Sequence, residues 1–233
     1  MNYDEMNPID YEKRCVKYAR EKYIHEHWYP IFKREVEKYC KTGIILDLGY
    51  GFGSITELVR KINSNVVGID IAGKWLSYSK RINPQQEVIL ADCTTIPLKD
   101  NSIDAIVSWG LFEYIDRKIT IKEIFRILKN HGICIIHVPN KYSANRCVCK
   151  IITKLLGKKY EKNEPSKSEM ITLFNHVGFE VIEFKMDDGL IWLPNCIDAV
   201  IGKKVYSFLE KVMKRNCENP YSEIMQIVVR KVK

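Results

Sequence analysis

A glycine-rich turn near position 50 carries residue types and a spacing that could bind a nucleotide-like ligand. Residues 44–54 contain a short apolar run that ends at Asp47. Glycine then recurs at every second position, at Gly49, Gly51 and Gly53. Glycine has no Cβ, so the turn can adopt positive φ and its backbone can lie directly against a ligand. An amphipathic segment follows, and the pattern therefore predicts a strand, a tight turn and a helix whose first N–H groups face the bound group.

Two further acidic residues stand where apolar runs end. Asp70 ends the run 65–70 and lies 21 positions beyond Gly49, near the spacing at which a carboxylate meets ribose hydroxyls. Asp92 follows a third run, 87–91. The carboxyl ends of parallel strands meet at one edge of a sheet, where α/β proteins bind ligands. We therefore expect these acids to share one site.

The order of these segments resembles that of class I S-adenosylmethionine-dependent methyltransferases. The resemblance covers about residues 44–185, with 223–231 as a final strand. It is most similar to the small-molecule branch that includes ubiquinone- and menaquinone-biosynthesis enzymes, the type 11 branch, although Tyr114 stands where a histidine is common. The motifs that carry it are Asp47-x-Gly49-x-Gly51-x-Gly53, Gly68-Ile69-Asp70, Ala91-Asp92, the run from Ile103 to Ser108 and the segment 108–116.

The resemblance implies S-adenosylmethionine as cofactor and S-adenosylhomocysteine as product. Asp47 would lie near the amino group of the methionine portion, Asp70 would accept hydrogen bonds from both ribose hydroxyls, and Asp92 would accept one from the adenine amine. The glycines would lie against methionine and ribose, with Ile71 and the backbone of Cys93 beside the adenine. The implied cofactor positions are Asp47, Gly49, Tyr50, Gly51, Gly53, Asp70, Ile71, Asp92, Cys93, Ser108 and Trp109.

A nicotinamide or flavin dinucleotide is the rival ligand for the glycine-rich turn. Its fingerprint needs glycine at the sixth position counted from Gly49, where this chain has Ser54. It also leaves Asp92 without a role. A glycine-rich turn that binds nothing is the remaining alternative, and the residues downstream favour the methyltransferase over both.

Three residues are candidates for a general base. Much of the acceleration of methyl transfer can come from holding the reactants in line and excluding water, so no catalytic residue is required. Glu113 and Tyr114 follow the fourth strand, and His137 ends the fifth. Imidazole titrates near neutrality, so His137 could deprotonate a hydroxyl acceptor. A structural role for His137 is the alternative, and Glu113 could equally contact the cofactor or cap the next helix.

Composition and charge limit the class of protein. The 233 residues, 46% of them hydrophobic, suit one globular domain. We expect a cytoplasmic protein, because no apolar run approaches the roughly 18 residues of a membrane span and the first residues do not resemble a signal peptide. The eight cysteines form no Cys-x-x-Cys pair, so we expect free thiols and no metal site.

The acceptor is predicted to be a small, partly apolar molecule methylated on oxygen, nitrogen or carbon. The net charge of +8 comes from two basic segments, 141–167 and 203–215, which raise nucleic acid as another acceptor. Against it, residues 108–111 read Ser-Trp-Gly-Leu where an adenine amine methyltransferase would carry Asp/Asn-Pro-Pro-aromatic. An RNA- or protein-modifying methyltransferase and a non-catalytic cofactor-binding subunit are the alternatives, and the oligomeric state is not predicted.

Alternating strands and helices predict an α/β fold. With the resemblance, this implies a seven-stranded, Rossmann-like, mostly parallel sheet with an antiparallel last strand, an N-terminal helical cap and helical insertions. The chain is predicted to be one methyltransferase domain, 1–233. Its expected parts are the cap 1–42, the cofactor-binding core 43–140 and the insertions 141–166 and 187–222. Strands are expected at 44–48, 65–70, 87–91, 103–108, 133–138, 179–185 and 223–231.

Several helices are predicted in detail. Helices within 8–40 should break near Pro30, because proline cannot continue a helix interior. The helix 117–129 should stop at Gly132 in a left-handed cap. The segment 143–158 is an amphipathic helix with a basic stripe at Arg146, Lys150, Lys154 and Lys158. Its apolar face comprises Ala144, Cys147, Val148, Ile151, Ile152, Leu155 and Leu156. It is a lid, a surface helix packed on the core, or an interfacial helix that meets anionic lipid. A second amphipathic helix is expected over 197–215.

Overall fold

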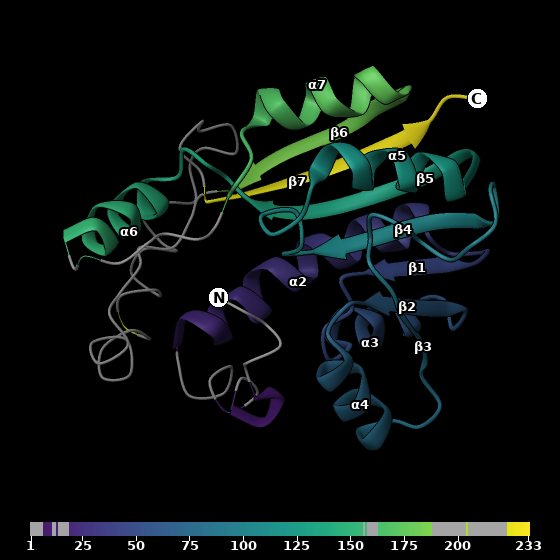
Figure 1. The fold of residues 1–233 in the computed structure, drawn as a ribbon, viewed down its shortest axis with the longest axis horizontal. Coiled ribbons are helices and arrows are strands. Elements are labelled where there is room, and N and C mark those ends of the chain that lie inside the picture. Colours follow the sequence, from purple (N-terminus) through teal and green to yellow (C-terminus); the bar gives the residue numbers. More distant parts are fainter. Residues whose placement is uncertain are drawn as a thin grey trace.

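A seven-stranded sheet runs through the centre of the computed structural model, which describes residues 7–10, 13, 19–155, 157, 163–187, 204 and 223–233. The strand order is β3-β2-β1-β4-β5-β7-β6 (Figure 1). The strands are β1 Ile45–Leu48, β2 Val66–Asp70, β3 Glu87–Leu90, β4 Ile103–Trp109, β5 Leu128–Pro139, β6 Phe179–Asp187 and β7 Ile224–Lys231. The helices are α2 Ala19–Tyr39, α3 Ser54–Arg60, α4 Gly73–Ile82, α5 Arg117–Ile127, α6 Ala144–Leu155 and α7 Lys167–Val177.

The pairing of the strands confirms the predicted mixed sheet. Strands β1 to β5 pair in parallel, and β7 runs antiparallel to both β5 and β6. All four residues of β1 are buried, as expected for a parallel strand covered on both faces. The parallel strands therefore present their carboxyl ends at one edge, where the predicted acids stand.

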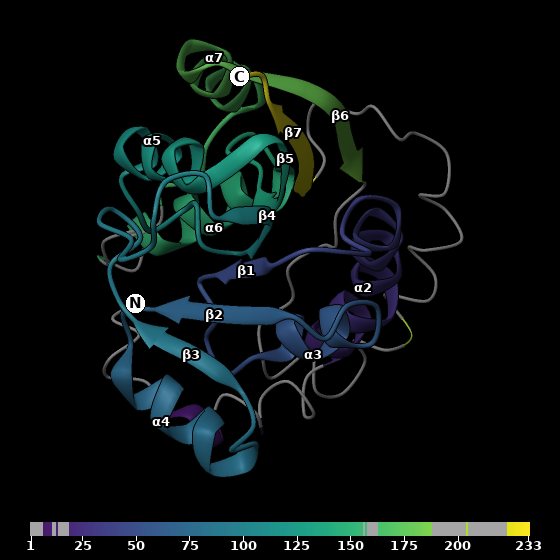
Figure 2. The same cartoon turned by 90° about the vertical axis from the view of Figure 1, so that its right-hand side faces the viewer.

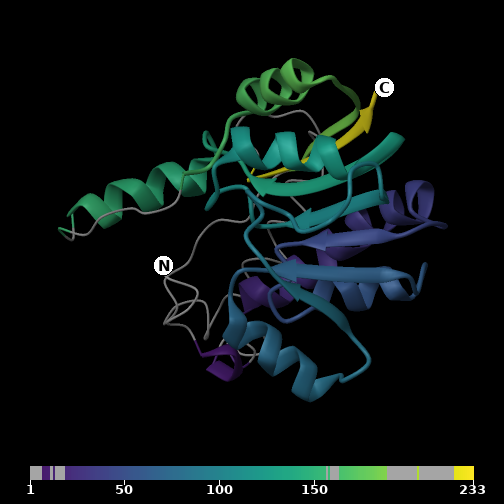
Figure 3. The same ribbon diagram turned by 45° about the vertical axis from the view of Figure 1, so that its right-hand side comes forward.

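Helices cover both faces of the sheet, with α2 and α3 on one side and α5 and α7 on the other (Figure 2). Successive strand residues alternate between these layers. Ile45 packs with Phe32 and Val36 of α2, whereas Leu46 belongs to the core formed with α5 and α7. Helix α6 leaves this body and projects from it (Figure 3).

The prediction that Pro30 breaks the N-terminal helix is wrong. Helix α2 continues through Pro30 to Tyr39. Pro30 is exposed, so the backbone carbonyl that loses its N–H partner can face water. On the other side Phe32 and Val36 are completely buried against the sheet. Packing of this apolar face outweighs the local cost of the proline.

The predicted end of the helix 117–129 is also wrong. Helix α5 ends at Ile127, and Leu128 already pairs with Ile103 as the first residue of β5. The left-handed residue is His131, with φ 63°, and Gly132 is not in that region. A Cβ on Gly132 would lie 2.8 Å from the Lys129 carbonyl oxygen, so glycine is needed for close backbone approach. Leu128 is completely buried, and its burial in the sheet decides where the helix stops.

Some predicted parts lie outside the described residues. They include nearly all of the insertion 187–222, with the helix expected over 197–215, and most of the first 18 residues. The division into cap, core and insertions therefore stays a prediction. In the described part of the chain, no helix combines the length and the apolar character needed to cross a bilayer.

Candidate functional site

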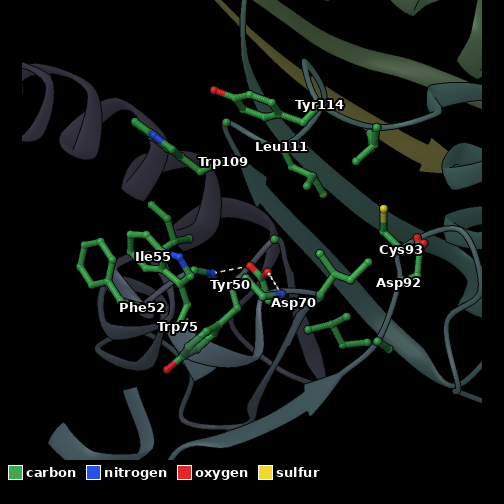
Figure 4. A pocket seen from close by; sticks show the side chains of 18 of the residues that line it. Tyr50, Phe52, Ile55, Asp70, Trp75, Asp92, Cys93, Trp109, Leu111 and Tyr114 are labelled. Atoms are coloured by element: carbon green, nitrogen blue, oxygen red, sulfur yellow. Dashed lines mark hydrogen bonds between the residues drawn. The ribbon is translucent and has the colours of Figure 1, made fainter. Parts of the chain in front are cut away.

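A cavity of about 530 Å³ opens at the carboxyl ends of strands β1 to β4 (Figure 4). The turn after each of these strands contributes to its wall. The described lining residues are 49–52, 54, 55, 69–72, 75, 91–94, 109–111 and 114–116. The predicted edge of the sheet therefore holds a site large enough for a nucleoside-sized ligand.

The glycine-rich turn adopts the backbone that its sequence predicts. Gly49, Gly51 and Gly53 have φ values of 83°, 57° and 92°, all in the left-handed region. A Cβ on Gly51 would meet no atom within 4 Å, because this residue faces the open cavity. Gly53 caps α3 and is not among the lining residues. The backbone at Gly49 and Gly51 is thus free to approach a ligand.

Asp70 joins this turn to the end of β2. Its Oδ2 accepts a hydrogen bond from the Gly51 N–H at 2.7 Å, and its Oδ1 accepts one from the Ala72 N–H at 2.9 Å (Figure 4). A carboxylate oxygen has two acceptor positions. Each oxygen therefore keeps one acceptor position while the carboxylate fixes the turn.

Asp92 and Cys93 lie apart from Trp109 and Tyr114 in the cavity (Figure 4). Oδ1 of Asp92 accepts hydrogen bonds from the backbone N–H and the hydroxyl of Thr94, each at 2.8 Å. These bonds hold the pKa of Asp92 below its usual value, so the carboxylate is ionised at neutral pH. Burial raises the pKa of the Cys93 thiol, which stays protonated.

An aromatic wall forms around Trp109. The indole lines the cavity and stacks on the His137 ring, with 3.4 Å between ring centroids. Tyr29 and Phe32 of α2 contact the indole edge-on, each at 5.2 Å between centroids. Contacts from α2 and β5 thus hold Trp109 in place, with Tyr114 beside it in the cavity wall (Figure 4).

Asp47 lies beneath the turn and does not line the cavity. Its side chain is buried, and Oδ2 accepts a hydrogen bond from the Thr56 hydroxyl at 2.7 Å. Burial raises the pKa of Asp47 to about 7; the Thr56 hydrogen bond opposes this shift and the Asp70 charge adds to it. Asp47 thus supports the start of α3 through Thr56, and its expected contact with the cofactor amino group stays a prediction.

Tyr50 and Ser108 are also held by the protein itself. The Tyr50 hydroxyl makes hydrogen bonds with Ser79 and Gln86, and its ring packs against Gly68. Ser108 is completely buried and donates a hydrogen bond to the Leu48 carbonyl at 2.9 Å. Tyr50 belongs to the cavity wall, whereas Ser108 is not among its lining residues.

Of the three candidate bases, Tyr114 lines the cavity, and Glu113 and His137 do not. Both of the latter are buried. Burial lowers the pKa of His137 well below its usual value, so its ring is neutral at physiological pH. His137 also contacts Trp28 edge-on, 5.2 Å between centroids. The structure thus places His137 behind the aromatic wall.

Other lining residues were not identified from the sequence. Phe52 and Trp75 stack with 5.8 Å between centroids, and Leu111 adds apolar surface. Phe52 lies inside the glycine motif and could have been found there. Leu111 lies inside the segment 108–116 and could have been found there. Trp75 carries no local signal, because its side chain reaches the cavity only through the packing of α4. Among the described residues, no three His, Cys, Asp or Glu side chains could together hold a metal ion.

Comparisons with known proteins agree with this geometry. Residues 46–136 match the family described as methyltransferase domain. An uncharacterized protein of Methanocaldococcus jannaschii is 33% identical over 144 residues, 60% of this chain and 60% of that protein. The ubiquinone/menaquinone biosynthesis C-methyltransferase of Geotalea daltonii is 34% identical over 113 residues, 42% of this chain and 46% of the enzyme. The chain thus spans between about half and three fifths of these curated relatives.

Solved structures share the fold along nearly the whole chain. A chain from the complex between the Haloferax volcanii Trm112 methyltransferase activator and a methyltransferase aligns with a TM-score of 0.69 and 18% identity, covering 100% of this chain and 98% of that one. A methyltransferase of Thermotoga maritima aligns with a TM-score of 0.65 and 18% identity, covering 96% and 95%. At this identity the likeness establishes the fold. The matched residues 46–136 thus form a methyltransferase domain, and in its sequence relatives and its fold the chain is similar to S-adenosylmethionine-dependent methyltransferases, including the ubiquinone/menaquinone branch.

Proposed function

We propose that this protein transfers a methyl group from S-adenosylmethionine to an oxygen, nitrogen or carbon atom of a small, partly apolar acceptor. The observation that carries the proposal is the division of one cavity into two regions. One region presents Asp70 and Asp92, and the other presents Trp109, Leu111 and Tyr114. Carboxylates suit the hydroxyls and amine of a nucleoside, and the aromatic region suits an apolar acceptor.

The residues present fit the cofactor. The second acceptor positions of Asp70 can bind the two ribose hydroxyls, and Oδ2 of Asp92 can accept from the adenine amine. Ile71 is 64% exposed although it lines the cavity, as expected of a side chain that a flat base would cover. Gly51 leaves open space for the ribose or methionine portion.

The charges of the cavity also suit a positively charged methyl donor. Bound S-adenosylmethionine supplies an electrophilic methyl group on a cationic sulfonium. Asp70, Asp92 and Asp116 line the cavity, and none of its described lining residues is lysine, arginine or histidine. A carboxylate attracts a nearby cation, more strongly where the surroundings exclude water.

We propose that Tyr114 hydrogen-bonds the acceptor and that His137 acts as a positioning residue. Tyr114 lines the cavity beside Trp109, whereas His137 supports the indole from behind. A neutral, buried imidazole is a flat partner for stacking and has no path to the acceptor past the indole. Glu113, buried just before Tyr114, is left with a structural role in this proposal.

Location and partners belong to the same proposal. A cytoplasmic location is supported by Cys40, Cys93, Cys134 and Cys147, which are free thiols, as is usual in reducing compartments. We also propose that an accessory protein could bind this chain, because the Haloferax volcanii structure of the same fold is a complex with an activator. An RNA or protein acceptor and a non-catalytic role remain the competing functions.

Calorimetric titration with S-adenosylhomocysteine tests the cofactor site. We expect micromolar binding by the wild type and at least tenfold weaker binding by Asp70→Ala, because the variant loses both the ribose acceptor and the bond that fixes Gly51. Glu180→Ala removes an exposed carboxylate of β6 and should bind like the wild type. NAD is the ligand control.

Two results would contradict the proposal. If folded wild-type protein binds no S-adenosylhomocysteine, the assignment of the cofactor is wrong. If it binds NAD instead, the cavity is a dinucleotide site. If the cofactor binds, S-adenosylhomocysteine release in the presence of small acceptors, RNA and protein separates the competing acceptor classes. Binding without release for any class would favour a non-catalytic subunit.

A further inference from the structure

Helix α6 is attached to the protein through its basic side. Nη2 of Arg146 lies 3.0 Å from Oε1 of Glu223, and Nη1 lies 3.8 Å from Oε1 of Glu164. Nζ of Lys150 lies 3.4 Å from Oε2 of Glu164, whose side chain is 0% exposed. Ser143, just before the helix, donates a further hydrogen bond to Glu223. These ion pairs fix which side of α6 faces the body.

Three apolar residues of α6 face away from the body. Cys147 is exposed, and Ile151 and Leu155 are 60% and 81% exposed. These three residues, here called the apolar stripe, follow one another at intervals of four and therefore lie along one helix face. Helix α6 projects from the molecule, so the stripe lies on an arm rather than in a crevice (Figure 3).

This orientation divides the predicted basic stripe, because Arg146 and Lys150 face the body. A carboxylate buried like Glu164 is very costly without a cationic partner. Arg146 and Lys150 supply that charge, so these two side chains must face inward. The apolar stripe is left outside as a consequence, and a contact with anionic lipid cannot use these two cations.

We propose that α6 docks the protein on an anionic membrane surface, with the apolar stripe entering the interface. Lys154, on the same arm, and Lys141, just before the helix, are both exposed and can face lipid headgroups. Helix α6 contains no acidic residue that would oppose this contact. An amphipathic helix of this kind binds lipid by burying its apolar face and by attracting anionic headgroups.

The place of α6 in the fold links docking to the cavity. The helix follows the carboxyl end of β5, at the same edge of the sheet as the cavity. Docking through α6 would bring this edge towards the bilayer. We expect the acceptor to be a molecule dissolved in this membrane, and this expectation rests on the proposed function. Docking itself requires only the helix.

Vesicle co-sedimentation tests the proposal. Wild-type protein should bind vesicles of equal parts phosphatidylcholine and phosphatidylglycerol at least tenfold more strongly than pure phosphatidylcholine, and added salt should weaken this binding. The double variant Ile151→Asp/Leu155→Asp should bind at least tenfold more weakly, and Lys154→Glu a few-fold more weakly. The control Ile82→Asp/Ile119→Asp changes two exposed apolar residues of α4 and α5 and should bind like the wild type.

Calorimetry with S-adenosylhomocysteine separates this proposal from the cofactor proposal, because all these variants should keep the wild-type affinity. Wild-type protein that stays in solution at low salt would overturn membrane docking, and so would an equal loss in the control variant. Light scattering tests the competing occupant. The proposal would be overturned if the wild type forms a dimer and binds no vesicles, and if Ile151→Asp/Leu155→Asp abolishes the dimer. The apolar stripe would then bind a second copy of the chain.

Discussion

Two carboxylates at the same edge of the sheet, Asp47 in β1 and Asp92 after β3, show how position alone sets the behaviour of a residue type. Asp92 is exposed at the cavity and accepts two hydrogen bonds from Thr94, which lower its pKa. Asp47 is buried and has its pKa raised to about 7. Asp92 is therefore a charged ligand for the cavity, whereas Asp47 is a buried support whose charge is costly.

Asp47 should make the stability of the protein depend on pH. Its pKa is about 7 in the folded state against an ordinary value of 3.8, so the folded protein keeps a proton that the unfolded chain has lost. The free energy of unfolding should therefore fall as pH rises from about 4 to about 7. Urea unfolding at pH 5 and pH 8 should show a loss about 2–3 kcal/mol larger in the wild type than in Asp47→Asn, at about 1.4 kcal/mol per pKa unit. Equal losses in the two proteins would show that Asp47 is not the group responsible.

At the scale of the elements, Tyr50 connects the glycine-rich turn to its surroundings. Its ring lies against Gly68 of β2, and its hydroxyl bonds with Ser79 of α4 and with Gln86 before β3. The turn backbone continues into Gly51, which bonds to Asp70. The shape of the cofactor-binding turn thus depends on how β2 and α4 pack around one tyrosine.

Replacing Gly68 by alanine should disturb this packing. The new Cβ would overlap the Tyr50 ring, which cannot move without breaking its bonds to Ser79 and Gln86. We expect a loss of at least about 2 kcal/mol in the free energy of unfolding and weaker binding of S-adenosylhomocysteine. Denaturant unfolding and calorimetry measure the two effects.

Gly73→Ala is the matched control. Gly73 is the first residue of α4, and its new Cβ would lie 3.7 Å from Leu90, an ordinary contact. Stability should stay within about 0.5 kcal/mol or rise by up to about 1 kcal/mol, since alanine favours a helix over glycine. Equal destabilisation by the two substitutions would refute the role given to the contact between Gly68 and Tyr50.

At the scale of the whole molecule, the cavity joins four strands through the turns that follow them. Because the cavity exists only in the folded state, a ligand that binds there should stabilise the entire fold by mass action. At a concentration of 100 times Kd the gain is about 2.7 kcal/mol. For a protein of this size that corresponds to a rise in Tm of roughly 5–10 °C.

Thermal unfolding with and without S-adenosylhomocysteine measures this rise. Wild type and Glu180→Ala should show it in full, whereas Asp70→Ala should show little at the same concentration. A full rise in Asp70→Ala would mean that the ligand does not depend on this carboxylate, and the assignment of the ribose position would have to be abandoned.

The sequence by itself determined the parallel part of the sheet, the glycine-rich turn and the acids at one edge, whereas the family resemblance implied the antiparallel last strand. These features depend on local signals: apolar runs of strand length, positive-φ glycines and acids that directly follow strands. Asp70 and Asp92 were found in this way because the carboxyl ends of parallel strands must lie together. The continuation of α2 through Pro30 and the early end of α5 before Leu128 were missed, since burial outweighed the local preference at both places.

Only the tertiary structure decided which side chains reach the cavity and which side of α6 faces outward. His137 looked like a base at a strand end, but α2 and Trp109 bury it. The sequence showed that Arg146 and Lys150 share a basic stripe, but only the structure showed that Glu164 and Glu223 hold them against the body. Periodicity shows that a helix has two faces. Which face turns inward depends on partners distant in the chain, and the cost of burying an unpaired charge settles it.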